Sequence, residues 1–201
     1  TDPMKFRADS DPTTRTDPRD SDTDDDGIGD GAEDADLDGM VDATETDPND
    51  HDTDNDLLPD GLEIGLTAST NDPGTNEASP NWRADSYPAS TTDPLDDDSD
   101  DDGILDGNED ADHDGLRDST ETDPNDADTD DDLLFDGTEI GLTEPQGTGT
   151  DPMAGHFFSD SDPSTNTDPC DSDTDDDGIG DGAEDADRDG LRDGTETDPL
   201  N

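Results

Sequence analysis

The sequence predicts an irregular fold, an elongated array of tandem repeats with little regular secondary structure, short turns, and at most small β pieces between the repeats. Three observations support this: extreme acidity, few core-forming residues and a repeated 12-residue pattern. Of the 201 residues, 66 are Asp or Glu and 8 are Lys or Arg, which gives a formal net charge of -58. Leu, Ile, Val and Phe total 23, so an ordinary hydrophobic core cannot offset the entropy lost on ordering.

The same composition argues against several functional classes. A net charge of this sign repels the phosphates of nucleic acid. No apolar run approaches the roughly 20 residues that a membrane-spanning helix needs. The single cysteine, Cys170, excludes an internal disulfide framework. No Ser–His–Asp or Cys–His arrangement stands at a plausible spacing, so we expect no enzymatic activity.

The 12-residue pattern first occurs at residues 22–33, which read D-T-D-D-D-G-I-G-D-G-A-E. Asp occupies positions 1, 3, 5 and 9, Gly position 6 and Glu position 12; in the copy at residues 52–63, Leu57 replaces the glycine. Positions 1, 3, 5, 9 and 12 of the copies account for 40 of the 66 acidic residues, which chance does not explain. The eight copies span residues 22–33, 34–45, 52–63, 98–109, 110–121, 128–139, 173–184 and 185–196.

These copies divide the chain into triplets of loops that recur at intervals of 76 and 75 residues, with inserts between them. The predicted segments are 1–21 (the end of an insert), 22–63 (a triplet), 64–97 (a Pro/Ser/Thr-rich insert), 98–139 (a triplet), 140–172 (an insert) and 173–201 (an incomplete triplet). An aromatic residue stands three positions before an Asp in each insert: Phe6 and Asp9, Trp82 and Asp85, Phe157 and Asp160. We therefore expect one recurrent element, although a freely moving linker is the alternative.

A T-D-P tripeptide precedes every copy that does not directly follow another copy. Its Asp lies five residues before position 1. The last T-D-P, with Asp198, predicts a further loop from position 203, so we expect the chain to be a segment of a longer protein.

The spacing of the acidic residues suits a hard divalent cation. A 12-residue loop can supply six to eight oxygen ligands from positions 1, 3, 5, 7, 9 and 12, with the ligand at position 7 being a backbone carbonyl. Glycine at position 6 permits the reversal of the chain. Calcium fits a dense carboxylate cage better than magnesium does, and zinc would require His and Cys. Position 7 is always apolar, and we expect its side chain to cover the neighbouring loop.

The candidate calcium ligands include the two acids upstream of each T-D-P-preceded loop. In the first triplet they are Asp17, Asp20, Asp22, Asp24, Asp26, Ile28, Asp30, Glu33, Asp34, Asp36, Asp38, Met40, Asp42, Glu45, Asp47, Asp50, Asp52, Asp54, Asp56, Leu58, Asp60 and Glu63. In the second they are Asp93, Asp96, Asp98, Asp100, Asp102, Ile104, Asp106, Glu109, Asp110, Asp112, Asp114, Leu116, Asp118, Glu121, Asp123, Asp126, Asp128, Asp130, Asp132, Leu134, Asp136 and Glu139. In the third they are Asp168, Asp171, Asp173, Asp175, Asp177, Ile179, Asp181, Glu184, Asp185, Asp187, Asp189, Leu191, Asp193 and Glu196.

Counting carboxylates separates two classes of loop. The T-D-P loops, preceded by that tripeptide, begin at Asp22, Asp52, Asp98, Asp128 and Asp173 and carry enough oxygen-bearing side chains for two ions each. The abutting loops, which directly follow another loop, begin at Asp34, Asp110 and Asp185 and should hold one ion each. Oxygen demand then predicts roughly 13 calcium ions, while one ion per loop, roughly 8, is the alternative.

Helix–loop–helix EF-hands are excluded because Glu33 is followed directly by Asp34 and Glu109 by Asp110, which leaves no room for flanking helices. Residues 20–63, 96–139 and 171–196 instead resemble thrombospondin type 3 repeats, in their cysteine-free bacterial and archaeal form. The resemblance implies a chain wrapped around a row of calcium ions in a secreted or surface protein. Residues 52–65 also resemble the paired-calcium segment of bacterial binary toxins. The long inserts are not part of the family pattern.

The function we expect is a calcium-stiffened spacer, stalk or fibre segment of an extracellular surface or filament protein, with calcium binding supplying the folding energy. Self-association into a fibre and O-glycans on the Ser and Thr residues of the inserts are further expectations. Alternatives are a calcium-dependent adhesin whose inserts present aromatics such as Trp82, a calcium reservoir or mineral-nucleating protein, and a linker within a secreted hydrolase. His51, His113 and His156 are expected at the surface rather than as ligands.

Overall fold

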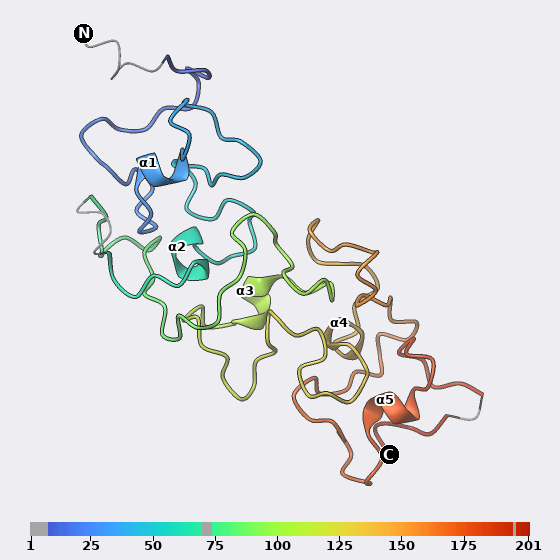
Figure 1. Cartoon of the computed structure of the whole chain (residues 1–201). Coiled ribbons are helices and arrows are strands. Elements are labelled where there is room, and N and C mark those ends of the chain that lie inside the picture. Colours follow the sequence, from blue (N-terminus) through green and yellow to red (C-terminus); the bar gives the residue numbers. More distant parts are fainter. Residues whose placement is uncertain (1–7, 70–73, 195) are drawn as a thin grey trace. The chain divides into compact units, whose positions relative to one another are not determined.

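The computed structural model describes residues 8–69, 74–194 and 196–201 (Figure 1). Within this part of the chain, turns and bends dominate and no strand is formed. The helices are single turns: α1 Asp30–Glu33, α2 Asp60–Glu63, α3 Asp106–Glu109, α4 Asp136–Glu139 and α5 Asp181–Glu184. An isolated antiparallel bridge joins Asp123 and Asp126, outside the inserts. The expected scarcity of regular secondary structure is therefore confirmed for the described residues.

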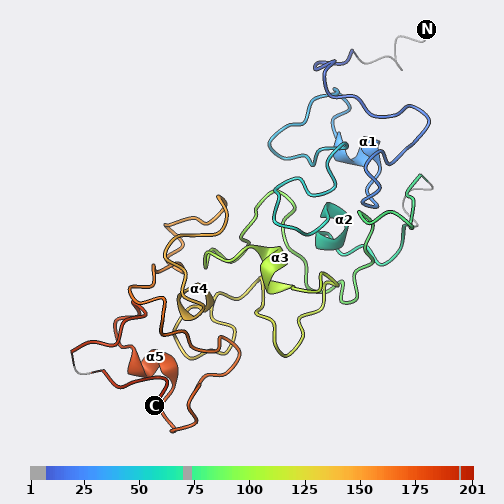
Figure 2. The ribbon, with the colours of Figure 1, turned by 180° about the vertical axis from the view of Figure 1, so that it is seen from behind.

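The chain divides into two compact units, which are described separately. Unit 1 runs to Asp96 and also includes His113–Leu116, and unit 2 consists of Asp97–Asp112 and Arg117–Asn201. Figure 1 and the view from behind in Figure 2 show each helix as one short turn between long irregular segments.

The backbone of the 12-residue loop is the same at two key positions in all eight copies. Position 6 has a positive φ throughout, from 71° to 105°: Gly27, Gly39, Leu57, Gly103, Gly115, Leu133, Gly178 and Gly190. Position 4 is also left-handed throughout: Asp25, Leu37, Asn55, Asp101, His113, Asp131, Asp176 and Arg188. Glycine adopts this conformation freely, whereas Leu57 and Leu133 are strained there and half-exposed. The backbone geometry of the loop therefore overrides the local preference of leucine at these two positions.

Helical turns form at positions 9–12 of the T-D-P loops and not in the described residues of the abutting loops. The reason lies at position 2. In T-D-P loops this residue is Thr or Ser, and its backbone N–H donates to the carboxylate at position 9. In four of the five loops its hydroxyl donates there too, as in Thr23, which makes bonds of 2.7 and 3.0 Å to Asp30. In abutting loops position 2 is Ala35, Ala111 or Ala186, which has no hydroxyl to donate.

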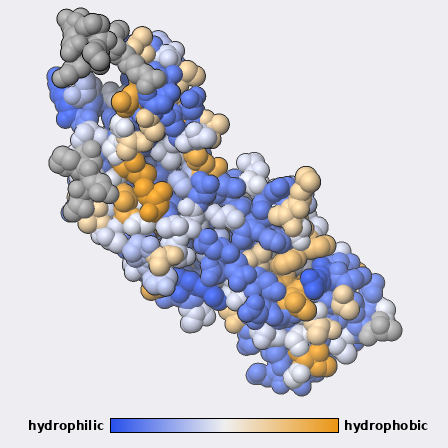
Figure 3. Space-filling model, in the orientation of Figure 1, coloured by the Kyte–Doolittle hydropathy of each residue, from blue (hydrophilic) through white to orange (hydrophobic). Residues whose placement is uncertain are grey.

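The interior is made of carboxylates rather than hydrocarbon. The buried hydrophobic residues in the described part are Leu58, Leu62, Ile104, Ala127 and Leu134, whereas the buried acidic side chains there number 23. The face in Figure 3 is mainly hydrophilic, with small separate hydrophobic patches. At position 7, Met40, Leu116 and Ile179 are more than one-third exposed, and the expectation that this side chain covers the neighbouring loop stays a prediction.

The inserts fold back onto the T-D-P loops in the same way in both units. The Trp82 ring lies so close over Gly27 that a Cβ there would overlap it, and Phe157 covers Gly103 in the same manner. The residue before each aromatic binds a position-3 carbonyl: the Asn81 amide donates to Asp24 at 2.6 Å, and His156 Nδ1 lies 2.6 Å from the carbonyl oxygen of Asp100. These aromatics therefore pack within the chain. His156 is half-buried rather than at the open surface.

Candidate metal centres

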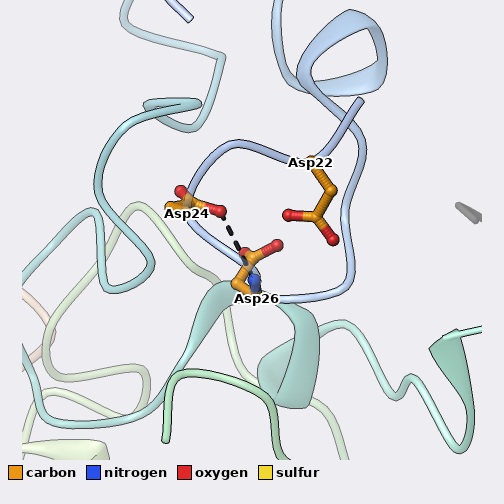
Figure 4. A group of neighbouring side chains, drawn as sticks. All are labelled: Asp22, Asp24 and Asp26. Atoms are coloured by element: carbon orange, nitrogen blue, oxygen red, sulfur yellow. Dashed lines mark hydrogen bonds between the residues drawn. The ribbon is translucent and has the colours of Figure 1, made fainter. Parts of the chain in front are cut away.

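The carboxylates at positions 1, 3 and 5 of a loop converge on one space. In the first loop, oxygens of Asp22, Asp24 and Asp26 lie within 4.8 Å of one another, and Figure 4 shows the three side chains facing the interior of the loop. Asp52, Asp54 and Asp56 form the same kind of group in the third loop. Clustered, buried acidic groups of this kind can hold metal ions.

Backbone hydrogen bonds fix one oxygen of these carboxylates. The position-7 N–H donates to Oδ1 of the position-5 Asp in all eight loops, over distances from 2.6 Å at Asp26 to 3.0 Å at Asp189. In T-D-P loops the position-5 N–H also donates to Oδ1 of the position-3 Asp, as Asp26 does to Asp24 at 3.3 Å. Within the folded loop, these hydrogen bonds fix the orientation of each carboxylate.

The second oxygen is left without a hydrogen-bond partner at several of these positions. It is buried and unpartnered in Asp24, Asp26, Asp100 and Asp130. A carboxylate oxygen can only accept, so burying it without a donor or a cation is unfavourable. A metal ion inside the loop would satisfy these oxygens.

A second group combines residues from two successive T-D-P loops of unit 1. Asp26, Glu33 and Asp60 are all buried, and their ligand oxygens lie within 4.8 Å of one another. Helix α2 passes beside Asp26, because Gly61 at position 10 has no side chain to keep it away (Figure 4). Both oxygens of Asp60 accept hydrogen bonds from Thr53, at 2.8 and 2.7 Å, and each retains a second lone pair.

In three of the T-D-P loops, the position-12 Glu is held by the threonine of a later T-D-P. Thr46 donates to Oε1 of Glu33 at 3.2 Å, Thr92 to Glu63 at 3.0 Å and Thr167 to Glu139 at 2.8 Å. In each of these glutamates Oε2 is buried without a partner. The role of this threonine and of position 2 was missed by sequence reasoning, although the alternation of Thr or Ser with Ala at position 2 is a visible signal.

Burial and neighbouring charge raise the pKa of these glutamates. Burial, followed by the charges of Asp24 and Asp26, raises the pKa of Glu33 to about 10, and burial with Asp56 and Asp54 raises that of Glu63 to about 11. A raised carboxyl pKa stabilises the folded state fully below the unfolded pKa of about 4 and loses this contribution as pH rises through the folded pKa. Ionising these groups at neutral pH would therefore require nearby positive charge, and the chain has only 8 Lys and Arg for 66 acids.

The abutting loops use their position-12 Glu differently. Both oxygens of Glu45 accept backbone N–H groups, from Asp36 at 3.2 Å and Asp42 at 3.1 Å. Glu196 likewise accepts from Ala186 and Asp193. Asp34, Asp36 and Glu45 still form a group that could hold an ion, with Glu45 alone buried. These loops thus offer fewer free oxygens than the T-D-P loops.

The acids upstream of the T-D-P loops are less enclosed than the loop carboxylates. Asp17 and Asp20 are exposed, as are Asp168 and Asp171. The T-D-P turn is nonetheless fastened to its loop, because the Asp17 N–H donates to the Thr23 hydroxyl at 3.0 Å. The expected pairing of ions in the T-D-P loops, which depends on these upstream acids, stays a prediction.

Comparison with known proteins gives no family for this chain: no family model matches it, and no curated protein or solved structure is significantly similar. Among the described residues, no helix is both long and apolar enough to cross a membrane. The likeness to thrombospondin type 3 repeats therefore rests on the sequence motifs alone.

Proposed function

We propose that the chain is a calcium-binding structural segment that orders on binding and serves as a stiff spacer, stalk or fibre segment outside the cell. The observation that carries this proposal is the set of buried carboxylates with one oxygen fixed by the backbone and the other unpartnered, such as Asp24 and Asp26. In the folded loop, such an arrangement is an oxygen cage that lacks only a cation. Calcium, with six to eight oxygen ligands and flexible geometry, suits it better than magnesium.

Location and mechanical role follow from the same chemistry. Extracellular calcium modules work at about 10⁻⁴–10⁻³ M, a level that the cytosol does not sustain.

Where two loops abut, Glu33 and Asp34 are neighbours in the chain and would serve successive ions. Neither loop can then pivot without disturbing a ligand of the other. The packing of Trp82 on Gly27 gives this aromatic an internal role, which favours a spacer over an adhesin that presents it to a partner.

Metal selectivity tests this proposal. Equilibrium dialysis against about 1 mM free calcium is expected to show at least one ion per loop, between roughly 8 and 13 per chain. An equal concentration of magnesium should displace few of them, because magnesium demands a near-ideal octahedral shell. Fewer ions than loops, or equal competition by magnesium, would reject the calcium cage.

A further inference from the structure

An aspartate from each insert lies against the position-6 glycine of an abutting loop. A Cβ built on that glycine would meet the carboxylate in all three cases, and none of these aspartates belongs to a 12-residue pattern. The pairs are Asp9 with Gly39, Asp85 with Gly115, and Asp160 with Gly190. Each pair lies within one unit.

The serine after each of these aspartates fixes the contact. The Ser161 N–H donates to the carbonyl of Asp189 at 2.7 Å, and its hydroxyl donates to Oδ2 of the same residue at 3.2 Å. Ser10 makes the same two bonds to Asp38, at 2.7 and 3.1 Å. Because Asp189 and Asp38 stand at position 5 of their loops, the insert docks beside the ligand carboxylates in a defined register.

One of the two carboxylate oxygens of Asp160 has no hydrogen-bond partner. Its Oδ1 accepts the N–H of Asp162 at 2.7 Å, while its Oδ2 is buried without a hydrogen-bond partner, in a residue that is only 3% exposed. Burial, followed by the charges of Asp162, Asp189 and Asp185, raises the pKa of this carboxyl. A buried acceptor among other acids calls for a cation.

We propose that Asp160 is a calcium ligand of the loop 185–196, donated by the insert 140–172; this inference rests on the proposed calcium function. Asp160 would be the sixth carboxylate of a loop that has five of its own. The addition matters because both oxygens of Glu196 already accept backbone N–H groups. Asp9 is the corresponding residue for the loop 34–45, in a more exposed setting.

As a consequence, the calcium ion of an abutting loop would link an insert to the array of loops. The same insert covers Gly103 with Phe157, three residues before Asp160. Calcium binding at residues 185–196 would therefore order the insert as well as the loop. The inserts would be structural parts of the metal sites rather than linkers between them.

The substitution Asp160→Asn tests this in the full chain by calcium titration, followed through the NMR amide signals of Gly190 and Gly178. The calcium concentration at the Gly190 midpoint is expected to rise about tenfold or more, the size typical of losing a partner in a metal site. The Gly178 midpoint, in the abutting loop 173–184, should shift clearly less, because it reports only the coupling between the two loops. Asp151→Asn, at an exposed position of the same insert, is the charge-matched control and should shift neither signal.

A second substitution leaves every carboxylate in place. Gly190→Ala would push the Asp160 carboxylate away, whereas Gly178→Ala, at the same loop position, meets no atom within 4 Å and reports only the backbone strain. Gly190→Ala is expected to lower the calcium affinity of the loop 185–196 several-fold more than Gly178→Ala lowers that of the loop 173–184.

The outcomes separate the two proposals. If the wild-type signals do not respond to calcium, the proposed function fails. If wild type responds but Asp160→Asn leaves the Gly190 midpoint unchanged, or shifts the Gly178 midpoint equally, Asp160 is not a ligand. If Asp160→Asn does not fold, equal effects of the two Gly→Ala substitutions overturn the inference.

Discussion

Removing calcium is expected to unfold the chain into an expanded coil. The 12-residue patterns hold 40 carboxylates, and the hydrophobic residues buried in the described part are too few to oppose their repulsion. Two charges about 4 Å apart repel by roughly 4 kcal/mol at an effective dielectric constant of 20. Because the loop carboxylates lie within 4.8 Å of one another in groups such as Asp22, Asp24 and Asp26, the ionised apo form cannot keep this arrangement.

Small-angle scattering measures this transition directly. An unfolded chain of 201 residues has a radius of gyration of about 48 Å. The value in chelator should approach or exceed this figure and should fall sharply when calcium is restored. Chelator saturated with calcium at the same ionic strength is the control, since it leaves salt screening unchanged. An equal radius with and without calcium would show that something other than the ions holds the chain.

The largest effect of a single substitution is expected for Glu33→Gln. Glu33 is 2% exposed and its Oε2 is unpartnered, and one of its carboxylate oxygens groups with those of Asp26 and Asp60, one residue from each of two loops. Gln keeps the hydrogen bond from Thr46 but removes the charge and one of the two carboxylate oxygens. The calcium concentration needed to order unit 1 is expected to rise at least about tenfold.

Hydrogen exchange on this variant also tests the coupling between loops. Protection should fall in residues 34–45 as well as in 22–33, because Glu33 and Asp34 are adjacent. Glu77→Gln, at an exposed insert position in the same unit, removes the same charge outside any loop and should change neither segment. If protection is lost in residues 22–33 alone, the loops act independently and the stiff-array proposal falls.

The local fold was predictable at positions where the residue type itself indicates the backbone conformation. Glycine at position 6 predicts a reversal of the chain, and every copy has a positive φ there, even where Leu57 and Leu133 occupy the position. The helical turns were not foreseen, because their cause is a hydrogen bond between positions 2 and 9 that neither residue signals alone, as between Thr53 and Asp60.

The sequence pattern could not predict which segments, far apart in the chain, contact one another. The sequence shows that Trp82 and Asp85 have counterparts in the other inserts, but it does not show which residues they contact. Their partners, Gly27 and Gly115, lie 55 and 30 residues away and are chosen by shape, since a glycine leaves room for a ring or a carboxylate.

The central claim is that the acidic loops hold calcium ions, and a calcium-anomalous difference map of crystals grown in calcium tests it most directly. The account predicts peaks among the position 1, 3 and 5 carboxylates of every loop, paired in the loops that begin at Asp22, Asp52, Asp98, Asp128 and Asp173 and single in those that begin at Asp34, Asp110 and Asp185. Empty loops, with peaks confined to exposed acids elsewhere, would contradict it.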